Sequence, residues 1–444
     1  MVPSLFAVMH AENLTTLELR YRWRRDLLTL SSAREWGEDV EWSRYGRDFS
    51  YRDPLMEDVR CLGNAETRDL FRKHGAQGYL GRVVGLLREG RHEGIRCFFH
   101  RGRDIRVAYN MHSSTLGIRN GNHAIRAGGI RRHAPGEGEL DVLVDGLNLA
   151  RAMSFKNAAA QVPFGGSKIT VQSEPVDLGD TDAVAFLAYC LDRTRSVTGP
   201  DMGLSPGLAD AMKDGGFSWN ITGGPRGRLG PTGDPTAHGV YAALEEAARH
   251  RWGNPSLAGR TIVVQGAGAV GRPLVENHLG GTGATILVAD LDPVPVAALV
   301  EKFPGRVKGI PVEGALLVEA DILVPCAAGG VFDDGTIPNL RCEMIFGAAN
   351  NQLKATSLEE EMRLAGLLAD RGILFQVDWV HNAGGVIAGM EEYLRGDQAS
   401  RERVLANTER VCREGTRQNL EAARREGITP TEMAYRHYSE QIFG

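Results

Sequence analysis

Two lysines flank an apolar, glycine-containing stretch in the segment SFKNAAAQVPFGGSKITVQ, residues 154–172. An ammonium group among alanine, valine, phenylalanine and glycine is costly to bury. In the structural reading, each amine reaches solvent from an apolar helix or loop. In the functional reading, both lysines converge on a small anion. One then binds a carboxylate as a point charge, and the other, with a pKa lowered by burial and a neighbouring cation, acts as a base.

A second motif with chemical potential is TIVVQGAGAVGRPLVENHLGGTGATILVADLD, residues 261–292. Gly266, Gly268 and Gly271 form G-x-G-x-x-G between a predicted strand and helix, which permits a tight turn, approach of a pyrophosphate and close helix packing. Asp290 closes the next strand, where a carboxylate binds ribose hydroxyls and repels a 2′-phosphate. No arginine or lysine follows in ADLDP, so the segment predicts NAD rather than NADP.

The bulk properties exclude several classes of protein. A chain of 444 residues predicts two domains, and its net charge of −5 gives no indication of nucleic-acid binding. The six cysteines are far apart and lack zinc-ligand spacing, so we expect no metal site and a reduced, cytoplasmic setting. The N-terminus does not resemble a signal peptide, and no window is apolar enough to span a membrane.

The elements that must position these motifs follow from sequence periodicity. Residues 94–114 alternate as two strands around a turn at 101–104, and residues 138–160 have helical spacing. The Pro/Gly-rich residues 220–236 predict a loop and a domain boundary. Beyond them, TIVVQ, TILVA, ADILVP, EMIFGAA and ILFQV alternate with helices, which is typical of a parallel sheet with crossover helices. Residues 400–427 form a charged amphipathic helix.

The N-terminal residues 1–85 are rich in arginine and aromatic residues and include Trp23, Trp36 and Trp42. Residues 21–42 are compatible with a helix. Because exposed, clustered tryptophans would form an apolar patch, we expect this segment to be an extension at a subunit interface. The predicted domains are this extension, a substrate domain (86–230), a dinucleotide-binding domain (231–380) and C-terminal helices (381–444) that return to the substrate domain.

The lysine segment KNAAAQVPFGGSK resembles the signature of the glutamate/leucine/phenylalanine/valine dehydrogenases, which interconvert L-amino acids and 2-oxo acids with NAD(P). The similarity runs in order from about Val107 to the C-terminal region. It continues through RAGGIRRH, TGPDMG, DPTAHGV, the dinucleotide segment, VPCAAGG, GAANNQL and NAGGVI. This resemblance implies an α/β protein with an N-terminal substrate and oligomerisation domain, a Rossmann domain and assembly into a homo-oligomer.

The resemblance also implies the role of each site residue. Lys156 would bind the α-carboxylate, Lys168 would be the catalytic lysine, and Asp201 would hold the α-amino group and exchange protons with Lys168. Hydride leaves Cα for NAD⁺, neutral Lys168 activates the water that attacks the iminium, and Asp201 relays protons as ammonia departs. The other implied substrate-binding residues are Ala127, Gly128, Gly129, Asn382, Val386 and Gly389. The implied cofactor-binding residues are Gly266, Gly268, Ala269, Val270, Gly271, Asp290, Thr236, Ala327, Asn351 and Asn382.

Two small residues predict the class of substrate. In the glutamate-specific branch of this family, a lysine occupies the position of Ala127 and a serine that of Gly389. Without them, a side-chain carboxylate would be buried without partners, whereas the extra volume suits a bulky apolar or aromatic side chain. We therefore expect an L-amino acid of that kind as the substrate.

Several alternatives stay open at this stage. Asp201 and Asn382 are also typical of turns and helix caps. Cys326 is more consistent with a buried strand end than with a nucleophile, and His381 either faces the nicotinamide or only packs. Rival functions are oxidation of a β-hydroxy or otherwise modified amino acid, and a non-catalytic regulatory homologue that binds an amino acid or a nucleotide.

Overall fold

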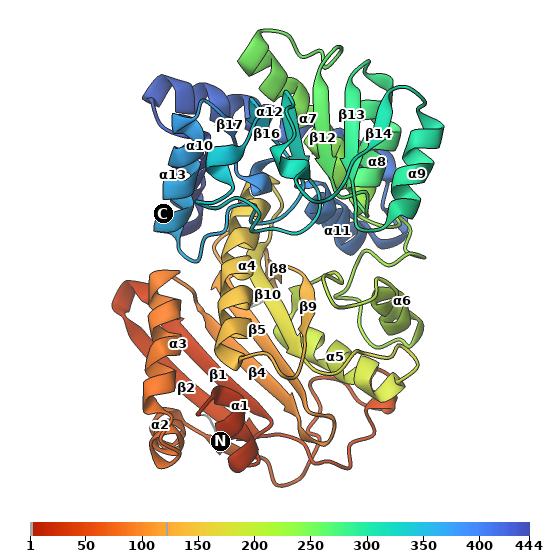
Figure 1. Ribbon diagram of the computed structural model, residues 1–444. Helices are drawn as coiled ribbons and strands as arrows, with labels where there is room; N and C mark the ends of the chain where they lie inside the picture. The colour runs from red at the N-terminus through yellow and green to blue at the C-terminus, as the bar shows by residue number, and fades with distance from the viewer. Residues whose placement is uncertain (1–2, 121–122) are drawn as a thin grey trace. The chain divides into compact units, whose positions relative to one another are not determined.

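The structure is a computed structural model that describes residues 3–120 and 123–444 (Figure 1). The chain forms two compact units. The first comprises Met1–Asn157, Pro163–Gly230 and Glu392–Asp397, and the second comprises Ala158–Val162, Pro231–Glu391 and Gln398–Gly444. The change from one unit to the other after Gly230 falls within the Pro/Gly-rich segment.

A nine-stranded sheet forms the centre of the first unit, with the order β11-β8-β10-β5-β4-β1-β2-β3 and with β9 beside β10. β4 and β5 pair antiparallel across a short turn, as the alternating sequence predicts. β10 pairs antiparallel with β5 and parallel with β8 and β9. The strands are β1 (Thr16–Arg22), β2 (Leu27–Arg34), β3 (Arg60–Leu62), β4 (Gly94–His100), β5 (Ile105–Ser113), β8 (Arg126–Ala127), β9 (Ile130–His133), β10 (Gly165–Gln172) and β11 (Ser196–Val197). A separate short pair is formed by β6 (Arg119–Asn120) and β7 (His123–Ala124).

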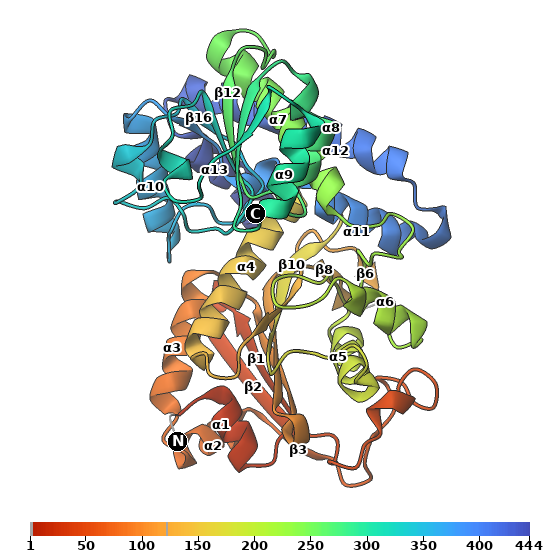
Figure 2. The ribbon, with the colours of Figure 1, turned by 45° about the vertical axis from the view of Figure 1, so that its right-hand side comes forward.

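Helices cover both faces of this sheet (Figure 2). On one face, α4 contributes Leu143 and Leu147 to a core that includes Leu19 of β1. On the other face, α5 contributes Phe186 to a core that includes Tyr109 of β5. The helices are α1 (Leu5–Ala11), α2 (Asn64–Lys73), α3 (Gln77–Glu89), α4 (Glu139–Ala159), α5 (Thr181–Thr194) and α6 (Gly207–Asp214). The predicted helix over residues 138–160 is thus confirmed as α4.

The N-terminal segment differs from its prediction. The expected helix over residues 21–42 is wrong: β1 and β2 form a hairpin there, and the turn between them places Asp26 at a φ of 47°. Strand pairing decides this, because β1 also pairs with β4, far along the chain. Trp36 and Trp42 are not an exposed patch but are buried against α5. β1, β2 and β3 belong to the same sheet as the predicted substrate domain, so the predicted boundary at residue 86 falls inside one unit.

The second unit contains a six-stranded, all-parallel sheet with the order β14-β13-β12-β15-β16-β17. The strand order reverses beside β12, as in doubly wound dinucleotide-binding folds. The five apolar runs predicted as strands are all found here. The strands are β12 (Thr261–Gln265), β13 (Thr285–Ala289), β14 (Val307–Gly309), β15 (Ile322–Pro325), β16 (Met344–Ile345) and β17 (Leu374–Phe375).

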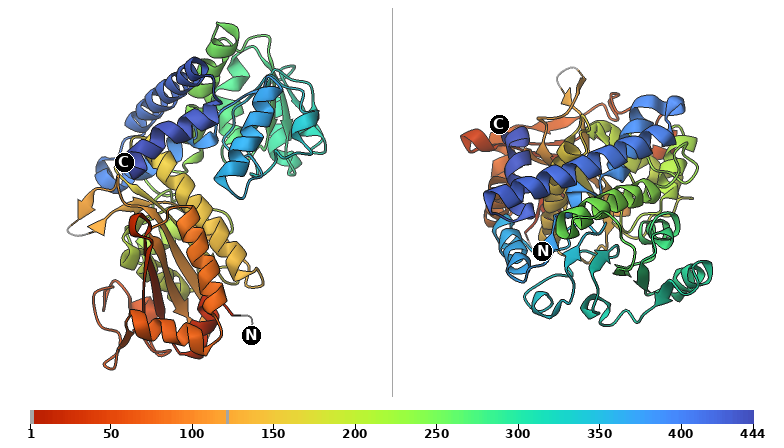
Figure 3. Two further views of the ribbon diagram at one scale, coloured as in Figure 1. Left: turned by 90° about the vertical axis from the view of Figure 1, so that its left-hand side faces the viewer. Right: turned by 90° about the horizontal axis from the view of Figure 1, so that it is seen from above.

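Helices also enclose this second sheet. The long C-terminal helix α12 runs beside α7 (Figure 3), as the amphipathic pattern of residues 400–427 predicts. The helices are α7 (Gly233–Trp252), α8 (Gly271–Asn277), α9 (Pro293–Lys302), α10 (Leu358–Asp370), α11 (Gly384–Arg395), α12 (Arg401–Glu426) and α13 (Pro430–Phe443). Across residues 3–120 and 123–444, none of the helices has the length and apolar character needed to cross a membrane.

Candidate active site

Lys168, which is buried, and Asp201, which is half-buried, form an ion pair in the first unit. Lys168 lies within β10 and is 5% exposed. Asp201 follows β11 in the GPDMG loop, where its backbone N–H donates to Ile130 O at 2.9 Å. The Lys168 ammonium donates to Asp201 Oδ2. The structure therefore brings together the two residues that the sequence predicts to exchange protons.

Arg131 of β9 is a third charged member of this cluster. Its Nη2 donates to Asp201 Oδ2 at 3.3 Å, and its Nη1 donates to Asp145 Oδ1 at 3.1 Å. Burial lowers the pKa of Lys168, and Arg131 adds to this effect while Asp201 opposes it. Although burial alone would raise the pKa of Asp201, Lys168 and Arg131 hold it well below its usual range. The carboxylate thus stays ionised, and the lysine is the member that can lose a proton.

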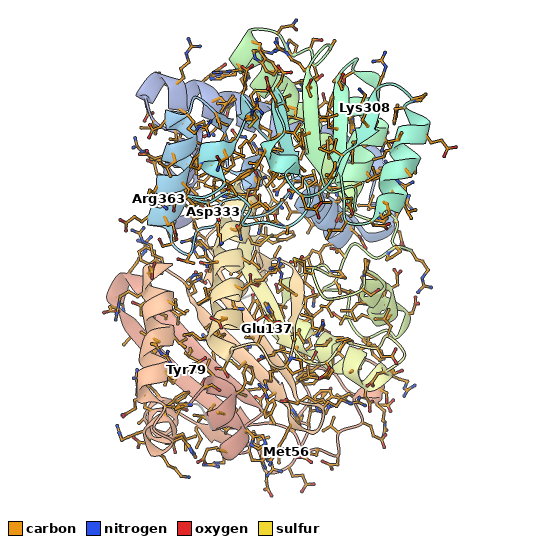
Figure 4. All side chains as sticks on the ribbon, viewed as in Figure 1. Met56, Tyr79, Glu137, Lys308, Asp333 and Arg363 are labelled. Carbon is orange, nitrogen blue, oxygen red and sulfur yellow. The ribbon has the colours of Figure 1, made fainter. Side chains whose placement is uncertain are left out.

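A layer of polar residues behind Arg131 fixes Asp145. His133 Nε2 lies 3.2 Å from Asp145 Oδ2, and its Nδ1 lies 2.8 Å from Oε2 of Glu137, which is labelled in Figure 4. The hydrogen bond to Asp145 raises the pKa of His133. Asp145 is therefore held from two sides, and it in turn orients the Arg131 guanidinium toward Asp201.

The two glycines of RAGGIRRH are needed for steric reasons. A Cβ on Gly129 would lie 2.6 Å from Lys168 Nζ and 3.3 Å from Asp201 Cβ, so a larger residue would displace the pair. A Cβ on Gly128 would lie 1.7 Å from Ser167 O on the neighbouring strand. Both residues were predicted to bind substrate. The structure gives them a packing role beside the ion pair.

Lys156 lies in the last turn of α4, on an element that packs closely against β10. A Cβ on Gly166 would meet the α4 backbone at 2.3 Å. Asn157 Nδ2 donates to Gly165 O at 2.8 Å and to Ala127 O at 3.4 Å. These hydrogen bonds connect α4 to the first residue of β10 and to the last residue of β8. The two lysines of the segment thus lie on adjacent, firmly connected elements. Ala127 is buried in β8.

The glycine-rich turn of the second unit has the geometry of a dinucleotide site. Gly266 has a φ of 98°, and a Cβ on it would meet the backbone after β15 at 2.9 Å. A Cβ on Gly271 would lie 1.9 Å from Gly266 O, so this glycine is required for close packing of α8. Gly268, in contrast, has no atom of the described residues within 4 Å of its Cβ position. Space for a ligand is therefore left at the second glycine.

Asp290, which the sequence predicts to bind the ribose, stabilises this turn. Its Oδ2 accepts from Ala267 N at 2.6 Å, and its Oδ1 accepts from Asp292 N at 2.9 Å. The neighbouring Leu291 is 89% exposed. Of the other predicted cofactor residues, Ala269 and Ala327 are exposed and Val270 is half-buried.

Asp378 connects two of the predicted site residues of the second unit. Its Oδ1 accepts from Asn351 N at 3.1 Å, and its Oδ2 accepts from Asn382 Nδ2 at 2.9 Å. Asn351 has a φ of 50°, and the contact to Asp378 helps to hold that left-handed conformation. Asn382 Nδ2 also donates to Ala348 O, whereas its buried Oδ1 has no partner within the described chain. An acceptor is therefore left for a ligand donor such as a carboxamide.

The DPTAHGV and NAGGVI segments meet at the start of α11. A Cβ on Gly384 would lie 2.1 Å from Pro235 O, and one on Gly385 would lie 3.3 Å from Thr236 Oγ1. The absence of side chains on these two glycines thus lets α11 approach the start of α7. Val386 and Gly389 follow within α11, where Val386 is half-buried and Gly389 is buried.

Two residues left open by the sequence have structural roles. Burial raises the pKa of Cys326 to about 11, so this residue is a thiol near neutral pH and not an activated nucleophile. His381 is fully buried, with Nε2 3.0 Å from Gly347 O and Nδ1 3.2 Å from Gln376 Nε2. Gln376 in turn accepts from Asn419 of α12. His381 therefore joins the end of the parallel sheet to the C-terminal helix.

Known proteins share this combination of segments. Residues 116–214 match the Glu/Leu/Phe/Val dehydrogenase dimerisation domain, and residues 294–443 match Glutamate/Leucine/Phenylalanine/Valine dehydrogenase. A valine dehydrogenase of Streptomyces albus is 35% identical over 308 residues, which are 68% of this chain and 80% of that protein. The chain belongs to the Glu/Leu/Phe/Val dehydrogenase family.

Other members of the Glu/Leu/Phe/Val dehydrogenase family support the same assignment. A phenylalanine dehydrogenase of Thermoactinomyces intermedius is 33% identical over 355 residues, covering 79% of this chain and 91% of that protein. The crystal structure of L-tryptophan dehydrogenase from Nostoc punctiforme superposes with a TM-score of 0.64 at 26% identity, covering 80% and 97% of the two chains. The predicted fold class and the prediction of an amino acid dehydrogenase are thereby confirmed.

Sequence reasoning missed four residues: Arg131, Asp145 and His133 near the Lys168–Asp201 pair of the first unit, and Asp378 beside Asn382 in the second. Arg131 lies in the RAGGIRRH segment, where a basic side chain two positions after Gly129 is an available signal. Asp378 lies four residues before Asn382, and an acid at that spacing before an asparagine could have indicated the hydrogen bond. Asp145 and His133 have no comparable signal, because only the packing of α4 and β9 brings them together.

Proposed function

We propose that this dehydrogenase oxidises a hydrophobic L-amino acid reversibly to the 2-oxo acid and ammonia, with NAD as the hydride acceptor. The Lys168–Asp201 pair carries the proposal. A buried amine with a lowered pKa, beside a carboxylate that stays ionised, is suited to move protons. A protein that only binds an amino acid has no need of such a base, so the pair argues against a purely regulatory homologue.

Four charged residues of the first unit have roles in this proposed reaction. NAD⁺, when bound, takes the hydride from the substrate Cα. Lys156 binds the α-carboxylate as a point charge, and Asp201 accepts a hydrogen bond from the α-amino group. Neutral Lys168 removes a proton from the water that attacks the iminium carbon. Asp201 then relays a proton to the departing amine, while Arg131 keeps its carboxylate in place and ionised.

The second unit supports the choice of NAD over NADP. Gly268 leaves space for the pyrophosphate, and Asp290 sits where a 2′-phosphate would be repelled. The exposed residue next to it, Leu291, offers no positive charge to attract that phosphate. The buried, unpartnered Oδ1 of Asn382 fits the carboxamide of the nicotinamide, and Thr236, Ala327 and Asn351 complete the proposed cofactor set.

Ala127 and Gly389 support a hydrophobic substrate. Neither offers a polar group to a side-chain carboxylate, whose burial without a partner is costly. The relatives named above are dehydrogenases of valine, phenylalanine and tryptophan, which agrees with an apolar or aromatic side chain. Gly128, Gly129 and Val386 complete the proposed substrate set. We also propose assembly into a homo-oligomer, in line with the dimerisation-domain match, and a cytoplasmic location.

The test is a screen of the purified chain against the L-amino acids, each with NAD and with NADP. NADH formation and ammonia release should be measured together. We expect both products in equal amounts with a large apolar or aromatic amino acid, and little activity on glutamate. Efficient oxidation of glutamate would overturn the substrate proposal, and preference for NADP would overturn the cofactor proposal. Release of NADH without ammonia would point to the modified-substrate alternative.

A further inference from the structure

An arginine-rich cavity of about 510 Å³ lies within the first unit. Its lining draws on β1, the turn after β1, β4, β5 and the end of α5, together with Arg119 of β6, Ala124 of β7 and Arg126 of β8. Among the residues that the structure describes, nine arginines contribute to this lining, and the carboxylates in it are those of Glu18 and Glu93. A volume of this size is within the range of sites for small metabolites. We refer to it below as the arginine cavity.

The positive charge of the arginine cavity is only partly neutralised. Glu18 pairs with Arg96 at 2.6 Å and with Arg20 at 2.5 Å, and Glu93 pairs with Arg126. By contrast, Arg22, Arg25 and Arg195 have no carboxylate within 4.0 Å in the part of the chain that the structure describes, and they surround the same space. Like charges held together in this way repel each other unless an anion joins them.

The wall of the cavity also contains buried groups without partners. The hydroxyl of Tyr109, a residue that is 2% exposed, lies beside the guanidinium of Arg126 and contributes to the raised pKa of that arginine. Within the described residues, however, neither this hydroxyl nor the buried Nε of Arg126 makes a hydrogen bond of good geometry. Such groups are rare in folded proteins and often mark the place of a ligand or an ordered water. These incompletely bonded groups, beside the guanidinium groups of Arg22, Arg25 and Arg195, favour a ligand rich in acceptors.

The arginine cavity is separate from the Lys168 site. Along β5, Tyr109 and Met111 line the cavity and belong to the α5 face of the sheet. Asn110 lies between them and pairs in register with Lys168. Successive side chains of a strand point to opposite faces, so Lys168 and the cavity lie on opposite sides of the sheet. The amino acid substrate therefore does not account for the cavity.

We propose that the arginine cavity binds a metabolite that carries a chain of phosphates. Guanidinium groups recognise phosphate oxygens with paired, charge-assisted hydrogen bonds, and several unpaired arginines suit more than one phosphate. A nucleoside triphosphate and a free polyphosphate share this chemistry. Arg126 directly precedes Ala127, a proposed substrate residue, so an occupied cavity has a short covalent path through β8 to the amino acid site.

Calorimetric titration of the full-length protein tests this binding without depending on catalysis. The probes are tripolyphosphate, ATP and adenosine, each titrated first without NAD and then in the presence of saturating NAD. We expect tripolyphosphate and ATP to bind and adenosine not to bind. Equal affinities would mean that the phosphate chain alone is recognised, and tighter binding of ATP would mean that the nucleoside contributes. Absence of binding by both phosphates, or loss of binding when NAD is present, would overturn the proposal.

Two sets of variants locate the site. Arg22→Ala combined with Arg25→Ala should weaken phosphate binding about tenfold or more, because it removes two exposed, unpaired cations. Arg47→Ala combined with Arg52→Ala changes the charge equally outside the cavity and should leave the affinity within about twofold. Arg195→Gly is a second cavity variant that suits the left-handed backbone at this position. Undiminished phosphate binding in both cavity variants would overturn the proposal. A changed oligomer mass of these variants in the absence of phosphate would overturn it as well.

Discussion

Arg131 Nη2 lies 3.3 Å from Asp201 Oδ2, the same oxygen that accepts from the Lys168 ammonium. One carboxylate oxygen is thus shared by a permanent cation and by a lysine whose pKa is lowered. Arg131 lowers the pKa of Lys168, whereas Asp201 raises it. The two neighbours therefore have opposite effects on the pH at which Lys168 becomes neutral.

This arrangement predicts opposite shifts in the pH dependence of kcat/KM. Activity should rise with pH as Lys168 loses its proton. Arg131→Gln raises the pKa of Lys168. It should therefore move the rising limb of the pH profile to higher pH by roughly one unit. Asp201→Asn lowers that pKa and should move the limb to lower pH, with a lower plateau because the proton relay is lost. Arg106→Gln, the same charge change at a distant ion pair, should leave the limb in place. Shifts in the same direction would contradict the assignment.

Lys168→Ala should lower kcat by about 10²–10⁴-fold, the usual contribution of a general base. Binding of NADH, measured by its fluorescence, should persist, because the glycine-rich turn belongs to the other unit. Lys302→Ala, at an exposed position on α9, is the matched control and should retain full activity. If purified Lys168→Ala turned over at the wild-type rate, Lys168 would have no part in the mechanism.

Leu291→Arg should raise the NADP-to-NAD ratio of kcat/KM by about tenfold, since the new cation would face the 2′-phosphate. Asp290 should be kept in this variant, because it also holds Ala267 N in the turn. Asp290→Ala is therefore expected to weaken the binding of both cofactors. Leu317→Arg adds the same charge elsewhere in the second unit and should not change the ratio. An unchanged ratio in Leu291→Arg would argue against the proposed ribose position.

Gly389→Val should narrow the range of substrates. The wild type should prefer an aromatic or large aliphatic L-amino acid over glutamate by at least ~10²-fold in kcat/KM. The added valine side chain should reduce activity on the bulkiest substrate and spare or improve activity on L-valine. Steady-state kinetics with both substrates would measure the effect. A parallel loss on all substrates would indicate a structural role for Gly389 rather than a role in selectivity.

Trp42→Ala should destabilise the first unit by about 3–5 kcal/mol, as for other large aromatic residues removed from a core. Trp42 is 2% exposed, and its ring packs edge-on against Phe186 and Tyr189 at centroid distances of 5.0 Å. Urea unfolding would measure the change. Trp219→Ala is the control, since Trp219 is 71% exposed and should change stability by about 0.5 kcal/mol or less. A small effect at Trp42 would argue against its place in the core.

Because the N-terminal strands belong to the central sheet, a truncation of residues 1–85 does not test whether this segment forms a subunit contact. Deleting residues 1–85 removes β1, β2 and β3 from the central sheet and exposes the edge of β4. Loss of solubility in such a truncation would therefore reflect damage to the fold rather than loss of a subunit contact. The predicted interface role of this segment is better tested by point substitutions on its exposed face.

The sequence alone predicted the parts of this protein that depend on local pattern. The glycine spacing before Asp290, the β4–β5 alternation and the helical period of residues 138–160 each indicate structure within a short window. The ordered series of family-like segments identified the amino acid dehydrogenase family. These inferences succeeded because backbone conformation and close packing restrict residue types over a few neighbouring positions.

Only the tertiary structure decided which distant charges meet. Arg131 and Asp201 are 70 residues apart, and Arg96 and Glu18 are 78 residues apart, so no local period connects either pair. The buried tryptophans and the arginine cavity likewise depend on β1 pairing with β4. Strand pairing between remote segments fixes these contacts, because hydrogen bonds and buried area across the sheet outweigh the weak helical preference of the N-terminal sequence.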